Sequence, residues 1–133
     1  MEYKLTYEQY QQGLRGGKFL GLLCENCGAY TFPAQGVCRN CGGQKLNVAE
    51  MKGEGTLRTF TVVRVAPEGM KPPYIIAMVE LDEGAWATGR VVDMNPDDAD
   101  MSLIGKRVRF GTQAAERASD PENIPYFLTF RLL

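Results

Sequence analysis

The 133-residue sequence contains no histidine and only two serines, Ser102 and Ser119. Histidine is the commonest general base and the usual partner of a nucleophilic serine or cysteine. Neither serine lies in the G-x-S-x-G context of a nucleophile elbow. We therefore expect no catalytic residues for a self-sufficient hydrolase or acyltransferase, while chemistry based on lysine or carboxylate stays open.

The sequence also lacks a charge excess and a long apolar run. Its 15 Lys and Arg against 16 Asp and Glu give a net charge of -1, which provides no overall field for holding a polyanion. No apolar run approaches the roughly 18 to 20 residues of a membrane span, and residues 1–10 do not resemble the apolar core of a signal peptide. With 44% hydrophobic residues, the chain is expected to be a folded, cytoplasmic protein without a membrane segment.

All four cysteines fall in one short segment as two C-x-x-C pairs, and Gly28 and Gly42 follow them directly. This spacing folds into a tight knuckle that points both thiolates at one metal. The glycines permit a turn with positive φ and leave backbone N–H groups free to bond the sulfurs. The sequence therefore predicts a tetrahedral four-thiolate site typical of structural zinc, with these ligands: Cys24, Cys27, Cys38 and Cys41.

Other interpretations of the four cysteines stay open. Iron in a rubredoxin-like site has the same ligands, and the residues alone do not distinguish it from zinc. Two disulfides would suit a secreted miniprotein, which fits poorly with a reducing compartment. We expect one structural Zn²⁺ per chain, because four thiolates leave no open coordination position. Such a site would use every thiol in the chain.

The first 16 residues have the pattern of a short amphipathic helix. Four large apolar residues recur at helical spacing: Tyr3, Tyr7, Tyr10 and Leu14. Thr6 and Gln9 have the spacing of a capping box, and Gly16-Gly17 is expected to end the helix. The apolar segment 18–23 then predicts a strand that leads into the first cysteine.

From Glu54 onward the sequence has the residue pattern of β-strands, rich in β-branched and aromatic residues. Five strand-like segments are expected: Gly55–Val65, Tyr74–Leu81, Ala85–Val92, Gly105–Phe110 and Tyr126–Leu132. Asn95–Leu103 begins with Asn-Pro and acidic residues, as a short helix does. Five strands with a helix between the third and fourth match the order of the OB-fold. Trp86 opens a strand after a turn, so it either fills the barrel or faces a partner, and we expect it in the barrel core.

The predicted architecture is mostly β, in three parts. An N-terminal helix occupies residues 1–18, a rubredoxin-like four-cysteine zinc ribbon residues 19–50, and a five-stranded OB-fold barrel residues 51–133. Two long connections, Ala66–Pro73 and Gly111–Pro125, would border the usual ligand face of such a barrel.

A ribbon joined to an OB barrel raises nucleic-acid binding as an alternative function. That function needs a basic surface with stacking aromatic residues. The densest basic cluster is Lys106, Arg107 and Arg109, and the acidic residues at positions 97, 98 and 100 offset it. Because the chain also has no basic tail, nucleic acid is not the partner that we expect.

The order of features resembles a family of zinc-ribbon/OB-fold proteins that accompany thiolases, long called domain of unknown function thirty-five. The matching segments are LRGGKFLGLLC, CENCGAYTFPAQGVCRNCGG, GEGTLRTFTVV, PPYIIAMVELDEG, GRVVD and GKRVRF. The cysteine pairs alone are not specific, but their combination with Phe32-Pro33 and the Y-I-I-A-x-V-E-L strand is distinctive. The resemblance covers almost the whole chain.

The resemblance implies a non-catalytic acyl-CoA-binding or scaffolding subunit in a hetero-oligomer with a thiolase-superfamily catalytic subunit. Acyl-CoA would be shared across the interface. The chain is also similar in size to small subunits of two-subunit thiolases, such as that of benzoylsuccinyl-CoA thiolase. The residues support this independently, because thiolase chemistry needs a free cysteine and usually a histidine, and neither is available here.

Two groups of residues are expected to serve that function. Arg15, Lys18 and Lys71 lie beside glycines or in a long connection and are candidates for binding the acyl-CoA phosphates. The apolar side of the N-terminal helix either packs on the neighbouring domain or contacts the partner, and we expect the partner contact because interfaces are enriched in aromatic residues. Its residues are Tyr3, Tyr7, Tyr10 and Leu14.

Overall fold

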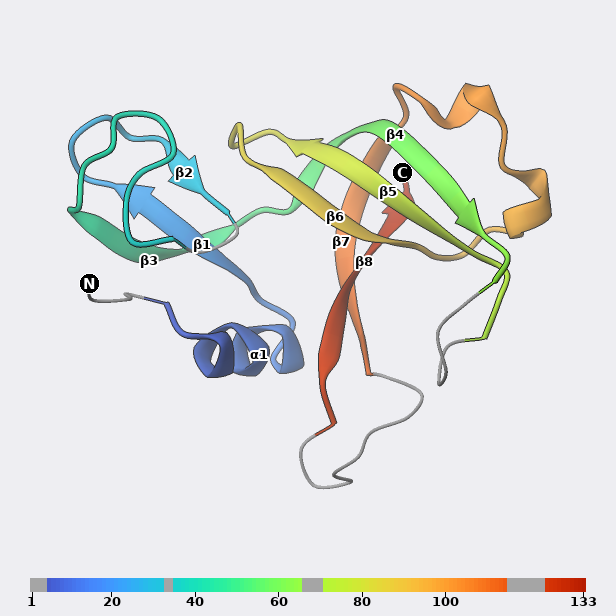
Figure 1. Ribbon diagram of the computed structural model, residues 1–133, viewed down its shortest axis with the longest axis horizontal. Helices are drawn as coiled ribbons and strands as arrows, with labels where there is room; N and C mark the ends of the chain where they lie inside the picture. Colours follow the sequence, from blue (N-terminus) through green and yellow to red (C-terminus); the bar gives the residue numbers. More distant parts are fainter. Residues whose placement is uncertain (1–4, 33–34, 66–70, 115–123) are drawn as a thin grey trace.

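The computed structural model describes residues 5–32, 35–65, 71–114 and 124–133. These residues form an N-terminal helix, a three-stranded antiparallel sheet and a closed five-stranded barrel (Figure 1). The expected architecture of helix, four-cysteine ribbon and OB-fold barrel is therefore confirmed. No helix in these residues is both long enough and apolar enough to cross a membrane.

Helix α1 (Tyr7–Arg15) begins with the capping box that the sequence predicts. The Thr6 hydroxyl accepts a hydrogen bond from the Gln9 backbone N–H, and the Gln9 side chain accepts one from the Thr6 backbone N–H. The helix ends at Gly16, whose N–H donates to the carbonyl of Gln12. Its buried side, with Leu14 fully buried, faces the ribbon and the barrel.

The ribbon sheet consists of β1 (Phe19–Cys24), β2 (Tyr30–Thr31) and β3 (Leu46–Met51), in the order β2-β1-β3. Strand β1 pairs along its whole length with β3, from Phe19 opposite Met51 to Cys24 opposite Leu46. The first cysteine pair lies at the end of β1, and the second lies between β2 and β3. Pairing of β1 with both neighbours therefore brings the two cysteine pairs together.

The barrel strands follow in the order β4-β5-β6-β8-β7, and the sheet closes on itself. They are β4 (Glu54–Val63), β5 (Tyr74–Leu81), β6 (Trp86–Val91), β7 (Arg107–Ala114) and β8 (Tyr126–Leu132). All neighbours are antiparallel except β6 and β8, which run parallel. Strand β7 extends to Ala114, so the first residues of the predicted connection 111–125 belong to a strand. The predicted connection 66–73 is described only from Lys71.

The single short helix expected over residues 95–103 is wrong in detail. The chain forms two separate 3₁₀ turns there, η1 (Pro96–Asp98) and η2 (Met101–Leu103). The Asn95 side chain caps the first turn, and the Asp100 side chain caps the second by accepting from the Ser102 N–H. Ala99 and Asp100 both have extended backbone and separate the two turns. A capping residue such as Asp100 has a non-helical conformation, so one helix cannot continue through it.

The ribbon and the barrel share one hydrophobic core. Phe19 and Met51 of the ribbon pack in the same cluster as Leu57, Val79 and Phe130 of the barrel. Phe19 also contacts the ring of Phe110 across the junction, with 5.4 Å between ring centroids. A second, smaller cluster contains Cys24 and Cys38 together with Leu5, Leu22 and Leu46. The cysteine site is thus anchored through β1 and β3 to the barrel.

The expected burial of Trp86 in the barrel is wrong. Trp86 is 44% exposed on the outer surface of β6, whereas Ala85, Ala87 and Gly89 face inward and are buried. A Cβ atom on Gly89 would lie only 2.8 Å from the ring of Phe130, which occupies this part of the interior. The barrel therefore takes small residues from β6 and directs the large one outward.

Candidate metal centre

The two cysteine pairs form matching knuckles. Gly28 and Gly42 directly follow them and have φ values of 76° and 75°, in the left-handed region that glycine adopts without strain. The N–H of Gly28 donates to the carbonyl of Cys24, and the N–H of Gly42 donates to that of Cys38, each at 3.0 Å. These turns fold each pair back on itself, so both thiols of a pair point to the same side.

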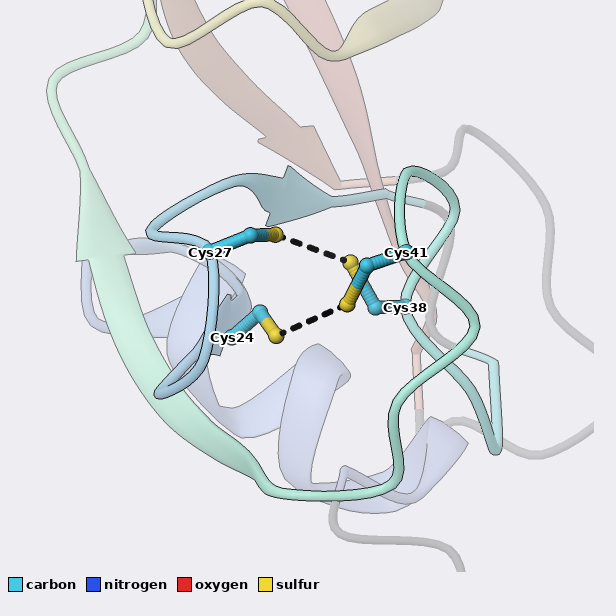
Figure 2. A group of neighbouring side chains, drawn as sticks. All are labelled: Cys24, Cys27, Cys38 and Cys41. Carbon is cyan, nitrogen blue, oxygen red and sulfur yellow. Dashed lines mark hydrogen bonds between the residues drawn. The ribbon is translucent and has the colours of Figure 1, made fainter.

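The four Sγ atoms lie within 4.8 Å of one another. Figure 2 shows the sulfurs of the two knuckles pointing toward each other, with Cys24 opposite Cys41 and Cys27 opposite Cys38, both at 3.6 Å. A disulfide would require about 2.05 Å, and none joins any of these four cysteines. A tetrahedron with Zn–S bonds of about 2.3 Å places its sulfurs about 3.8 Å apart. The donor set therefore fits a tetrahedral zinc ion.

Burial divides the four ligands into two kinds. Cys24 and Cys38 are buried, at 1% and 2% exposure, whereas Cys27 and Cys41 are exposed. The site thus has one side embedded in the smaller hydrophobic cluster and one side open to solvent. With four protein thiolates around it, a metal here would have no open position for a substrate.

Backbone donors prepare the sulfurs for the thiolate state. Hydrogen bonds from the backbone of Cys41 and of Asn40 lower the pKa of the Cys38 thiol to about 6. A backbone bond from Gly43 lowers the pKa of Cys41, but bonds shared with the Cys24 and Cys27 sulfurs raise it overall to about 11. Four sulfurs this close cannot all be thiolates without a compensating positive charge, which a divalent metal supplies.

The structure does not bring the three candidate acyl-CoA cations together. Arg15, in the last turn of α1, donates to the Ile124 carbonyl at 3.0 Å and lies over the Tyr126 ring. Lys18 is exposed at the entry to the ribbon. Lys71 is exposed just before β5, which begins on the side of the barrel away from α1 (Figure 1). Arg15 therefore has a structural contact, while Lys18 and Lys71 face solvent at separate places.

The expected contact side of the N-terminal helix is partly used within the chain. Leu14 is fully buried in the main core, which corrects the expectation that it contacts a partner. Tyr10 is half-buried against Phe32, and burial together with the nearby Tyr7 raises its pKa to about 12. Tyr7 is 71% exposed. Tyr3 lies outside the described residues.

A second exposed apolar surface lies on the barrel and includes Trp86, for which contact with a partner was the alternative to a place in the core. Trp86 pairs with Glu80 and Thr88 pairs with Met78, so Met78, Trp86 and Thr88 share the outer surface of two adjacent strands. Met78 is 41% exposed and Trp86 44%. We call these three residues the outer β5–β6 face. The alternation of small and large residues along β6 was the signal that could have revealed it.

Two family models match consecutive parts of the chain. The model "ChsH2, rubredoxin-like zinc ribbon domain" matches residues 11–47, and the model "ChsH2, C-terminal OB-fold domain" matches residues 48–113. The chain is 36% identical over 116 residues to a DUF35 domain-containing scaffold protein of Methanocaldococcus jannaschii, covering 84% of this chain and 79% of that protein.

Two further similarities involve enzyme complexes. The solved structure titled "Ltp2-ChsH2(DUF35) aldolase" superposes with a TM-score of 0.74 at 25% identity, covering 92% of this chain and 91% of that one. Benzoylsuccinyl-CoA thiolase subunit BbsA of Geobacter metallireducens is 29% identical over 63 residues, 47% of this chain and 42% of that subunit. With its four-cysteine ribbon and closed barrel, the chain belongs to the family of DUF35 domain-containing scaffold proteins.

Proposed function

We propose that this protein is the non-catalytic scaffolding subunit of a thiolase-type complex, and that it binds acyl-CoA jointly with a catalytic subunit. The observation that carries the proposal is the position of the thiols: all four lie in one cluster that a structural zinc, one per chain, would occupy. The chain also has no histidine. Thiolase chemistry needs a free nucleophilic cysteine, so the partner must supply it.

The similarities supply the kind of partner. One similar protein is a thiolase subunit, and one similar structure is an aldolase complex that includes a DUF35 protein. Within the described residues, the ribbon and the barrel share one hydrophobic core, so side chains occupy their interior. A site shared across a subunit interface is therefore the better physical solution. A reducing cytoplasm, which keeps the thiols available to a metal, belongs to this proposal.

We place the interface on Tyr7 and on the outer β5–β6 face. Stable interfaces are enriched in exposed Trp, Tyr and Met side chains. Tyr7, Trp86 and Met78 are large apolar side chains that the described structure leaves more than one-third exposed. Lys18 and Lys71 are the cations that we propose for the acyl-CoA phosphates, with Arg15 already engaged by Ile124 and Tyr126.

The alternative of nucleic-acid binding is weakened by the ion pairs of the barrel. Arg107 forms a two-bonded ion pair with Asp82, and Arg109 forms one with the buried Glu54. Arg107 and Arg109, the two residues of the basic cluster that lie on β7, are thus neutralised by neighbouring carboxylates. A surface that binds the phosphate backbone needs such side chains free.

The proposal is tested by co-expressing the tagged full-length chain with a thiolase-superfamily enzyme from the same genome. Size-exclusion chromatography with light scattering should detect a hetero-oligomer, and a fluorescent single-stranded oligonucleotide should remain unbound. In the purified complex, Lys18→Glu and Lys71→Glu should weaken acyl-CoA binding without preventing assembly. Lys45→Glu, a charge reversal on the exposed ribbon surface, is the matched control. Tight oligonucleotide binding without complex formation would instead favour the alternative.

A further inference from the structure

Asn40, between Cys38 and Cys41, contacts sulfurs of both knuckles. Its backbone N–H donates to the Sγ atom of Cys38 in its own knuckle at 3.4 Å. Its side-chain Nδ2 donates to the Sγ atom of Cys27 in the other knuckle at 3.7 Å. Asn40 is thus linked to two ligand sulfurs that lie 3.6 Å apart, one in each knuckle.

Cys27 is the ligand for which such a contact matters. Cys24 and Cys38 are held by burial in the smaller hydrophobic cluster. Cys27 is exposed, in the turn between β1 and β2, and has no comparable packing. An exposed thiolate keeps its ligand geometry through the hydrogen bonds that it accepts, and groups outside the ligand set commonly supply them.

We propose that Asn40 is a positioning residue of the metal centre, whose side-chain amide holds Cys27 in place and slows loss of the metal. The donor is the neutral Nδ2 group, which compensates part of the negative charge on the sulfur without adding a ligand. The amide also links one knuckle to the other, so it opposes their separation.

The first knuckle offers a matched control. Asn26 is the same residue type at the corresponding place, before Cys27. The structure gives the Asn26 side chain no hydrogen bond to any of the four described cysteine sulfurs, and its Nδ2 atom lies beside Gly43. Substitution of Asn26 therefore removes an equivalent amide from an equivalent knuckle while leaving the contact with Cys27 intact.

The experiment uses the zinc-loaded full-length protein and three variants: Asn40→Ala, Asn40→Asp and Asn26→Ala. Each is mixed with a chromophoric zinc chelator, and the rate of zinc transfer is measured.

Removing a supporting hydrogen bond of this kind typically costs about 10- to 100-fold in metal affinity. We expect transfer from Asn40→Ala to be about 10-fold faster than from wild type. Transfer from Asn40→Asp should be faster still, because a carboxylate beside thiolates is repulsive. Asn26→Ala should stay near the wild-type rate.

A second readout separates positioning from general loosening of the ribbon. In the cobalt-substituted protein, loss of an amide donor leaves the sulfur richer in electrons, so the sulfur-to-cobalt charge-transfer band should move to longer wavelength in Asn40→Ala only. Equal acceleration in the Asn40→Ala and Asn26→Ala variants would overturn the proposal. So would an unshifted band, or a wild-type transfer rate, in Asn40→Ala.

Discussion

Gln11 on helix α1 and Tyr126 at the start of β8 exchange two hydrogen bonds. The Gln11 Nε2 donates to the Tyr126 carbonyl at 2.9 Å, and the Tyr126 backbone N–H donates to the Gln11 Oε1 at 2.7 Å. The side-chain amide thereby acts as one more strand partner for the beginning of β8. Since Leu14 of the same helix is buried in the main core, α1 is an integral part of the barrel's support.

Replacing Gln11 with alanine should lower the free energy of unfolding by about 1–3 kcal/mol, because two half-buried backbone groups of Tyr126 lose their partners. The measurement is the midpoint of urea unfolding with metal bound. Gln12→Ala, which truncates the neighbouring exposed side chain, should unfold near the wild-type midpoint. Equal midpoints for all three proteins would show that the pair contributes nothing to stability.

Metal analysis of protein purified without added metal should give one zinc per chain. Cys24→Ser should abolish stable binding and unfold the ribbon, because metal binding at such sites contributes on the order of 10–16 kcal/mol. Elemental analysis together with thiol titration of the native protein checks both points. A metal content far below one per chain, together with four reactive thiols, would contradict the assignment of a metal site. Iron found in place of zinc would contradict the identity of the metal.

Stability should fall at acid pH in a way that depends on Glu54. Hydrogen bonds from Arg109 and from Lys52 hold the pKa of Glu54 below its ordinary value of 4.5. A carboxyl whose pKa is lower in the folded state stabilises the fold above the unfolded-state pKa and loses that contribution as the pH falls through the folded one. Glu54→Gln should therefore show a shallower decline in unfolding free energy below about pH 4.5 than wild type.

Urea unfolding at a series of pH values measures this dependence. The comparison with wild type matters, because metal release at low pH destabilises both proteins alike. Glu50→Gln, at an exposed position of β3, should decline as steeply as wild type. Identical slopes for the Glu54→Gln variant and wild type would show that the Arg109–Glu54 pair has no such role.

The sequence was sufficient for the elements whose signal is local. The C-x-x-C spacing with its following glycines predicts the cysteine cluster, and Thr6 with Gln9 predicts the helix start. The alternation along β6 indicates that Trp86 and the small residues lie on opposite faces, but which face is the inner one is set by distant residues such as Phe130 of β8, which packs against Gly89. The helix expected over residues 95–103 failed for a local reason, since the cap preference of Asp100 outweighed helix continuity. The role of Asn40 required the three-dimensional contact between knuckles.

Because Trp86 is the only tryptophan, it reports directly on the proposed interface. Binding of the catalytic subunit should shift the Trp86 fluorescence to shorter wavelength, because the half-exposed indole loses water. The partner is used in a tryptophan-free form, or its own fluorescence is subtracted. Trp86→Glu should weaken binding by at least about 10-fold, the scale of an interface hot spot. Thr61→Glu, a charge introduced at an exposed position of β4, is the control. Equal weakening by both substitutions would remove Trp86 from the interface.

The most direct measurement is the turnover of a 3-oxoacyl-CoA, such as acetoacetyl-CoA, by the reconstituted pair. This chain alone should show only background cleavage, the thiolase-superfamily subunit alone should show little, and the stoichiometric mixture should be the active species. The Trp86→Glu variant should raise activity less than wild type at subsaturating concentration. Cleavage by the purified chain alone, or full activity of the catalytic subunit without it, would contradict the account.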